Sequence, residues 1–298
     1  MTARSEVRVG ERALAISNLD KVLWPSTGFT KGQLIDYYAR VADTMVPHLH
    51  SRPITLRRWP DGVEAQSFFQ KNCPAHKPDW MDAVTMGGVR YCLIDEPASL
   101  VWAANMAAIE LHPGLAQAPD LDTPTAVVFD LDPGPPADVL TCARVAVLLR
   151  GYFDRLHLSA WPKTSGSKGL QLYVPLNSRN VTFDDSKAFA KAVAELLERA
   201  DPDVVVSSMS KARRTGKVLI DWSQNDHRKT TVCAYSLRAR PLPTVSTPVE
   251  WAEVSATLDS RDPTALAFEA GQVLERVAER GDLFAPVLSL VQELPALS

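Results

Sequence analysis

The sequence contains no run of about 18 apolar residues, the length that a helix needs to cross a bilayer. Its first twelve residues, MTARSEVRVGER, have no apolar stretch behind their charges, as a secretory signal would have. We therefore expect a cytoplasmic protein with no membrane partner.

Cysteine is scarce and widely spaced. The chain has 4 cysteines, Cys73, Cys92, Cys142 and Cys233, and none belongs to a CxxC pair or to a Cys/His cluster with zinc-ligand spacing. We expect ordinary buried or half-buried thiols, with neither a structural zinc site nor a disulfide framework.

Neither charge sign dominates, and a net charge of -3 argues against a protein that coats nucleic acid non-specifically. Basic residues nevertheless gather at 57–59, 210–217, 227–229 and 236–240. Such blocks can line one cleft of an otherwise neutral protein, or they can be solvated loops. The 46% hydrophobic content is typical of a globular chain, and we find no internal repeat or low-complexity tract.

The order of apolar patterns predicts an α/β (α+β) fold with mixed central sheets flanked by helices. In the first half, Thr30 and Gln33 form a capping box for a helix that should end near Pro47. The other elements expected there are a strand pair over 7–18, strands at 53–59 and 67–71, and a helix over 97–111 that ends at His112-Pro113-Gly114.

The second half alternates strands and helices. Strands are expected at 125–132, 159–165, 170–176, 203–209 and 217–223, helices at 138–153 and 184–200, a proline-dotted segment at 241–248 and a helical tail from Pro263. We expect one domain over 1–298, with an N-terminal module (1–115), a catalytic core (116–248) and a helical tail (249–298).

Three acids stand at the ends of apolar strands. Asp130 and Asp132 are two positions apart in VVFDLD, so strand geometry points both to one face. Nearby carboxylates repel unless neutralised, and hard oxygen ligands favour Mg²⁺ or Mn²⁺. Asp221, which ends KVLID, supplies a third carboxylate for a two-metal phosphoryl-transfer site. The alternatives are a DxDPG turn whose acids cap backbone amides and, for Asp221, a surface acid.

A small-residue loop, TSGSKGLQLY, stands between two expected strands. Ser165, Ser167 and Lys168 could hydrogen-bond and neutralise phosphate oxygens there. The loop departs from the Walker A pattern, and a strand follows it where a Walker A loop is followed by a helix. The alternative is a flexible hairpin turn.

Several motifs follow one another in a fixed order: NLDKVLWP, TGFTK, RPITLRRWPDG, SFFQK, ELHPG, DLDPG, SGSKGL, IDWSQN and YSLRAR. In this order they resemble the polymerase domain of bacterial ATP-dependent DNA ligase D, of the archaeo-eukaryotic primase superfamily. The resemblance covers the chain to about Pro248. It implies a template-dependent nucleotidyltransferase that adds nucleotides, preferably ribonucleotides, to DNA 3′ ends at gaps or breaks, with Ku and a separate DNA ligase as candidate partners.

The resemblance also implies roles for individual residues. Asp130, Asp132 and Asp221 would be catalytic and hold two Mn²⁺ or Mg²⁺ ions. Nucleotide (NTP or dNTP) contacts would come from His112, Ser165, Lys168, Arg214 and Arg238. Beside these we expect Ser167, Gln171 and Lys229 to contact the nucleotide as well. Contacts with DNA would come from Asn18, Lys21 and Lys31 at a downstream 5′-phosphate, and from Arg57, Phe68 and Phe69 near the template strand.

Other interpretations of the same residues remain open. Phe68 and Phe69 could be plain core, Lys21 and Lys31 surface lysines, and His112 a satisfied buried histidine. Where the family has histidine after SGSKGL this chain has Gln171, which cannot carry charge, so we expect lower triphosphate affinity or a lower rate.

Two other functions use the same features. One is a non-catalytic module that binds DNA ends, and the other is a metal-dependent nuclease, because two-metal sites also serve hydrolysis. The chain has no KxDG-type ligase motif and no room for a ligase or phosphoesterase domain, so we expect a stand-alone member of the family.

Overall fold

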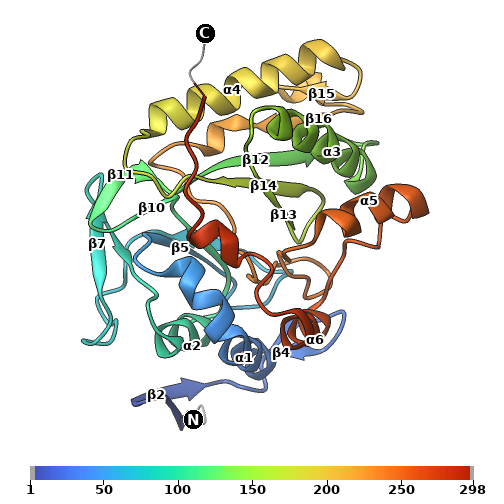
Figure 1. The fold of residues 1–298 in the computed structure, drawn as a ribbon. Coiled ribbons are helices and arrows are strands. Elements are labelled where there is room, and N and C mark those ends of the chain that lie inside the picture. Colours follow the sequence, from blue (N-terminus) through green and yellow to red (C-terminus); the bar gives the residue numbers. More distant parts are fainter. Residues whose placement is uncertain (1–3, 296–298) are drawn as a thin grey trace. The chain divides into compact units, whose positions relative to one another are not determined.

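The computed structural model describes residues 4–295, and these fall into two units (Figure 1). Unit 1 combines described residues of Met1–Pro119, Thr230–Ser246 and Phe268–Asp282, and unit 2 combines those of Asp120–Lys229, Thr247–Ala267 and Leu283–Ser298. The division into 1–115, 116–248 and 249–298 stays a prediction.

The strands of unit 1 follow the expected pattern in its first part. β1 (Arg4–Val9) and β2 (Arg12–Ser17) form the predicted strand pair, which is antiparallel and begins at Arg4, before the predicted range 7–18. β5 (Ile54–Arg58) pairs with β6 (Phe68–Gln70), with β8 (Val89–Cys92) and with β9 (Ala108–Pro113), and β7 (Ala83–Met86) extends the sheet beyond β8. The remaining strands are short: β3 (Val22–Trp24), β4 (Phe29–Thr30) and β10 (Ala116–Gln117).

Helix α1 (Lys31–Leu49) begins at the predicted capping box, in which the Thr30 side chain accepts from the Gln33 N–H. The helix ends near Pro47, as predicted, but it runs through the proline to Leu49. A proline in the last turn removes only one helical hydrogen bond. The fully buried Leu49 side chain stabilises that turn.

Helix α2 (Pro97–Asn105) is shorter than predicted, since residues 108–111 belong to strand β9. Ala107 adopts a positive φ of 57°, which ends the helical path. An apolar run such as AAIEL is compatible with helix or strand, and pairing with β5 decides in favour of the strand. His112 is therefore a strand residue.

The third segment of unit 1 carries α6 (Ala270–Arg280), which packs on α1. Just after it, the Asp282 carboxylate lies 2.8 Å from His48 Nε2 and accepts a hydrogen bond of 2.6 Å from the Tyr235 hydroxyl. These contacts join all three segments of unit 1.

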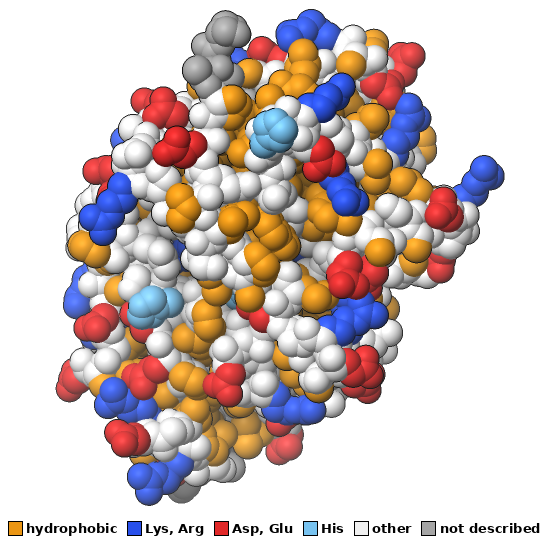
Figure 2. All heavy atoms as spheres, in the orientation of Figure 1, with side chains coloured by type: hydrophobic (Ala, Val, Ile, Leu, Met, Phe, Trp, Pro, Cys, Tyr) orange, Lys and Arg blue, Asp and Glu red, His pale blue; other side chains and the backbone are white. Residues whose placement is uncertain are grey.

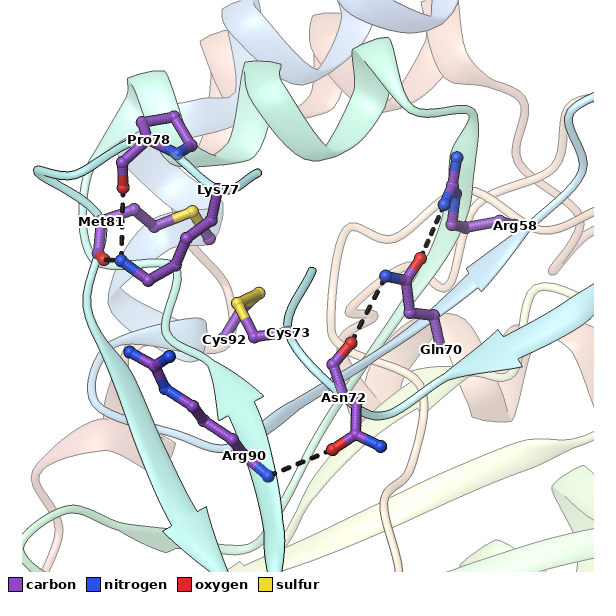
Figure 3. Close-up of a disulfide and its surroundings, with 9 residues drawn as sticks. All are labelled: Arg58, Gln70, Asn72, Cys73, Lys77, Pro78, Met81, Arg90 and Cys92. Carbon is purple, nitrogen blue, oxygen red and sulfur yellow. Dashed lines mark hydrogen bonds between the residues drawn. A yellow bond between two sulfur atoms is a disulfide. The ribbon is translucent and has the colours of Figure 1, made fainter. Parts of the chain in front are cut away.

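Two of the four cysteines form a disulfide, which corrects the expectation of free thiols. Cys73 and Cys92 are bonded, with their Cα atoms 4.8 Å apart (Figure 3). The backbone N–H of Cys73 donates to the Arg90 carbonyl, which aligns the loop after β6 with β8. This alignment depends on tertiary structure and leaves no trace in cysteine spacing. Cys142 and Cys233 are free and buried, as expected.

Unit 2 is built on a five-stranded sheet in the order β13 (Trp161–Thr164), β14 (Leu170–Pro175), β12 (Ala126–Pro133), β16 (Val218–Asp221) and β15 (Val205–Val206). All pairs are antiparallel except β15 with β16. Four of the five strands fall within predicted segments, and β12 extends one residue beyond its segment, to Pro133. β11 (Asp120–Pro124) precedes the sheet.

One face of this sheet packs against α3 (Val139–Arg155) and α4 (Phe183–Ala200), both of which were predicted (Figure 1). The Phe129 ring lies 5.0 Å from Phe153 of α3 and 6.3 Å from Phe189 of α4. Because side chains alternate along β12, Asp130 and Asp132 point to the opposite face.

The remaining elements of unit 2 are α5 (Trp251–Ser260) and three 3₁₀ helices: η1 (Lys211–Arg213), η2 (Trp222–Gln224) and η3 (Ala285–Leu288). The predicted helical tail thus contains α5, α6 and η3. In residues 4–295, no helix is both long and apolar enough to cross a membrane.

Candidate active site

A row of polar side chains crosses the sheet of unit 2. Lys163 on β13 is opposite Gln171 on β14, Gln171 is opposite Asp130 on β12, and Asp130 is opposite Asp221 on β16. Directly paired residues of antiparallel strands share a face, so the four side chains form one row. Within it, Gln171 Nε2 donates to Asp130 Oδ1 at 3.0 Å.

Asp132 lies two residues further along β12 on the same face and is exposed. Burial, the charge of Asp132 and then that of Asp221 raise the pKa of Asp130 to about 7, against the hydrogen bond from Gln171 and the charge of Lys163. In the metal-free protein the row therefore carries more negative charge than its surroundings neutralise. A cation would relieve that repulsion.

The Asp221 carboxylate is also held from its own side. It accepts hydrogen bonds from the Ser223 N–H and Gln224 Nε2, each at 3.0 Å, so that it caps η2. Lys229 Nζ in turn donates to Ser223 Oγ at 2.5 Å, which brings the lysine next to this acid.

The residues present fit hard divalent cations by their chemistry, because three carboxylates on adjacent strands offer oxygen ligands. Within the part of the chain that the structure describes, they are not drawn together into a closed group of three ligands. The strand register therefore places the three carboxylates on one face of the sheet. To coordinate a metal ion, their side chains would have to move closer together.

The SGSKG segment is an ordered turn. Ser165 Oγ accepts from the N–H groups of Ser167 (3.2 Å) and Gly169 (3.1 Å), and the Ser165 N–H donates to the Gly169 carbonyl. A Cβ atom at Gly169 would lie 1.9 Å from the carbonyl oxygen of Leu131, the residue between the two acids of β12. The buried Ser165 side chain thus shapes the turn, while Ser167 and Lys168 are exposed.

A second glycine brings a basic segment to the same strand. Gly134 directly follows β12, and a Cβ there would lie 1.9 Å from the carbonyl oxygen of Arg214. Its N–H donates to the Lys217 carbonyl, and its carbonyl accepts from Gly216. Arg214 is therefore held close to the turn after Asp132.

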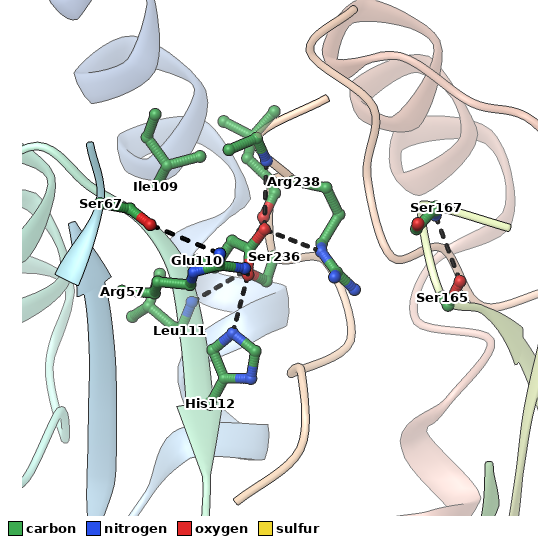
Figure 4. A network of polar contacts seen from close by, with 12 residues as sticks. Arg57, Ser67, Ile109, Glu110, Leu111, His112, Ser165, Ser167, Ser236 and Arg238 are labelled. Atoms are coloured by element: carbon green, nitrogen blue, oxygen red, sulfur yellow. Dashed lines mark hydrogen bonds and ion pairs between the residues drawn. The ribbon is translucent and has the colours of Figure 1, made fainter. Parts of the chain in front are cut away.

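In unit 1, a buried carboxylate gathers three basic side chains (Figure 4). Glu110 Oε2 lies 3.0 Å from His112 Nε2 and 3.5 Å from Arg57 Nη1, and Oε1 lies 3.1 Å from Arg238 Nε. Burial alone would raise the pKa of Glu110. The hydrogen bond from His112 and the charges of Arg238, His112 and Arg57 outweigh it and lower the pKa to about 2.

The aromatic pair Phe68 and Phe69 is exposed, at 44% and 58%, so the alternative of plain core is wrong. Each ring has an arginine at its face: Arg58 lies 5.1 Å from Phe68 and Arg57 4.9 Å from Phe69. The strand register makes these same residues direct neighbours. Paired arginines thus hold two rings that remain largely accessible to solvent.

The residues expected at a 5′-phosphate divide into two environments. Asn18 and Lys21 line an open cavity of about 570 Å³, and Lys21 Nζ donates to Asp61 Oδ1 at 2.7 Å. Lys31 is buried and donates to the Ser17 carbonyl and to Asn105 Oδ1, so it is not a surface lysine. Burial, then the charges of Lys21 and Arg58, lower its pKa to about 8.

Sequence reasoning missed several residues of these sites. Lys163 is completely buried beside the acids, and Glu110 anchors the basic cluster. Glu110 stands in the ELHPG motif, but the sequence analysis assigned a role only to His112 of that motif. The glycines of DLDPG and SGSKGL were visible in the sequence, but their role as close-approach points required the fold.

The face drawn in Figure 2 shows basic and acidic side chains interspersed among apolar ones. This mixed distribution agrees with the small net charge of the chain. Contacts with an anionic partner would then depend on local groups such as those described above.

Comparison with known proteins adds independent information. The family model of the LigD primase-polymerase domain matches residues 30–284. The multifunctional non-homologous end joining protein LigD of Mycolicibacterium smegmatis is 40% identical over 278 residues, which cover 91% of this chain and 36% of that protein. The bifunctional non-homologous end joining protein LigD of Bacillus subtilis is 32% identical over 268 residues, 90% of this chain and 43% of that protein.

The chain thus spans less than half the length of these relatives. Among solved structures, the polymerase domain from Mycobacterium tuberculosis ligase D in complex with DNA matches with a TM-score of 0.85 and 40% identity, covering 92% of this chain and 98% of that one. This match confirms the predicted mixed α/β fold. The chain therefore belongs to the LigD primase-polymerase domain family, whose members are metal-dependent nucleotidyltransferases.

Proposed function

We propose that this chain is a template-dependent polymerase that adds nucleotides, preferably ribonucleotides, to DNA 3′ ends at gaps or breaks. The observation that carries the proposal is the placement of Asp130 opposite Asp221 on adjacent strands, with Asp132 on the same face. A relative of 40% identity was solved in complex with DNA, which supports a DNA substrate.

Asp130, Asp132 and Asp221 are the residues that would hold two Mn²⁺ or Mg²⁺ ions. When bound, such ions activate a hydroxyl for attack and neutralise charge on a departing pyrophosphate. The raised pKa of Asp130 in the metal-free protein supports this role, because the carboxylates lack sufficient counter-charge of their own.

The residues that we propose as nucleotide contacts are hydrogen-bond donors and cations. In unit 2 these are Ser167 and Lys168 of the exposed turn, Gln171 of the polar row, Arg214 and Lys229, with Ser165 fixing the shape of the turn. In unit 1 they are His112 and Arg238. Such preorganised groups stabilise charge as it develops on the leaving phosphates.

DNA would be bound mainly by unit 1. Stacking on an exposed ring is tolerant of sequence and contributes about 1–3 kcal/mol per base, which suits Phe68 and Phe69 for reading any template. Asn18 and Lys21, at the open cavity, would bind a downstream 5′-phosphate, with the buried Lys31 beside them. We further propose a task in non-homologous end joining, after the names of the relatives. Ku and a separate DNA ligase, which the family resemblance implies, are the partners that we propose for it.

The decisive test is primer extension on a gapped duplex with a 5′-phosphate, in Mn²⁺, with ribonucleotides or deoxynucleotides, for wild type and Asp130→Ala. Template-directed addition by wild type alone, faster with ribonucleotides, is the expected result. Tight gap binding without addition by either protein would favour an end-binding module, and metal-dependent shortening of the primer would favour a nuclease.

A further inference from the structure

The Glu110 carboxylate is a buried anion that is stabilised by groups of the protein and not by solvent. Its side chain lies on β9, it is 2% exposed, and its two oxygens face only donors. Oε1 meets Arg238 Nε at 3.1 Å and the Ala239 N–H at 3.2 Å, while Oε2 meets His112 Nε2 at 3.0 Å and Arg57 Nη1 at 3.5 Å. A charge buried in this way is stable only while these partners remain.

The ionised Glu110 carboxylate also determines which ring nitrogen of His112 carries the proton. A carboxylate can only accept hydrogen bonds, so the proton of a neutral His112 must be on Nε2. Nδ1 is then the ring atom left for other partners. Without the carboxylate, the ring could rotate or exchange tautomers.

From Glu110 the contacts continue to the aromatic pair. Arg57 Nη2 donates to Ser67 Oγ, and its guanidinium lies 4.9 Å from the Phe69 ring and 4.6 Å from Trp59. The Phe69 ring in turn lies 6.0 Å from the His112 ring, edge to face. Glu110 therefore orients His112 and Arg238, which are proposed to bind nucleotide, and Arg57 (Figure 4). Through Arg57 it also orients the Phe69 ring, which is proposed to bind template.

We propose that Glu110 is a positioning residue for nucleotide binding, which fixes the orientation of His112 and Arg238 and, through Arg57, that of Phe69. It acts through these side chains and does not contact the substrate. This inference rests on the proposed polymerase function, because it assigns Glu110 to the groups named there.

Glu110→Gln tests the proposal with little change of shape. The amide would turn an NH₂ group towards two of the four donors, and the negative charge that Glu110 places beside Arg57 and Arg238 would be lost. We expect the KM for the nucleotide to rise roughly tenfold or more, on the scale found when a group that orients a ligand-binding side chain is removed. The kcat should change much less, and affinity for gapped DNA should fall.

Two further variants make the result specific. Glu96→Gln is the matched control, because Glu96 also pairs with an arginine of unit 1, Arg12, but at the surface. It should leave KM unchanged. Glu110→Asp keeps the charge on a shorter side chain and should give a KM between those of wild type and Glu110→Gln. Thermal unfolding of each variant shows whether it is folded.

The outcomes separate the two hypotheses. If wild type adds no nucleotide, the proposed function fails and the role of Glu110 fails with it. If wild type is active and Glu110→Gln keeps a wild-type KM, only the positioning role is overturned. The positioning role is also overturned if the KM of Glu110→Asp is as high as that of Glu110→Gln. Should Glu110→Gln not fold, the KM of Glu110→Asp decides: a raised value supports the role and a wild-type value refutes it.

Discussion

Replacing Asp130 by asparagine should stabilise the metal-free protein. The pKa of this carboxyl rises from 3.8 to about 7 on folding, because of burial and of the charges of Asp132 and Asp221. A group whose pKa is raised in the folded state destabilises that state increasingly as the pH climbs between the two values. About 3 pH units at about 1.4 kcal/mol each give a ceiling of about 4 kcal/mol. Because the side chain is partly exposed, solvent screening reduces this to about 1–2 kcal/mol.

The assay is thermal unfolding in a chelator between pH 4 and pH 8. At pH 8 the Tm of Asp130→Asn should exceed that of wild type by a few degrees, at roughly 2–4 °C per kcal/mol. The difference should shrink towards pH 4, where wild-type Asp130 is protonated in the folded state. Mn²⁺ should raise the Tm of wild type more than that of the variant, and the variant should not extend a primer.

Asp226→Asn is a control in which we expect the opposite change in stability. A hydrogen bond from Lys187, then one from the Arg228 N–H, lower the pKa of Asp226, so its charge stabilises the fold above the unfolded-state pKa. This variant should lose stability at pH 8. A lower Tm for Asp130→Asn at pH 8, or a gain that does not depend on pH, would refute the electrostatic reasoning.

Three other substitutions test separate features. Gly169→Ala places a Cβ 1.9 Å from the Leu131 carbonyl, so nucleotide addition should disappear while the helical circular dichroism signal stays; normal activity would contradict the close approach. Phe69→Ala, at a ring that is 58% exposed, should weaken gapped-DNA binding on the order of tenfold with little change in Tm, whereas a large loss of Tm would mark a core residue. Cys73→Ser opens a disulfide between residues 19 apart and should reduce stability by about 3 kcal/mol; a reductant should lower the Tm of wild type equally and leave the variant unchanged.

Local patterns in the sequence were sufficient to predict most of the helices and strands. The five strands of the unit 2 sheet, its two main helices and the capping box of α1 all depend on periodicity or on neighbours three residues apart. Predictions were wrong where tertiary contacts determine whether a segment is a helix or a strand. The run from Ala108 to Leu111 suits a helix or a strand, and only pairing with β5 selects the strand.

In the candidate site, too, local patterns predict some features, whereas others depend on tertiary structure. Asp130 and Asp132 are two apart in one strand, so the sequence alone puts them on one face. Their pairing with Asp221 and the presence of Lys163 depend on the order of strands in the sheet, which periodicity does not encode. Glu110 lies two residues from His112 in the ELHPG motif, but its contacts with Arg57 and Arg238 join residues far apart in the chain, so its role required the fold.

The contacts of Asp282 affect the order in which the chain can complete its folding. During synthesis α1 emerges early, but α6 and Asp282, which bind its C-terminal end through His48 and reach Tyr235, are translated only after all of the strands. Until then the part of α1 that α6 covers remains open to chaperones or to other nascent chains. A gene shortened to end before α6 would therefore damage unit 1, although the first segment of that unit is synthesised first. The product should aggregate even though every proposed catalytic residue is present.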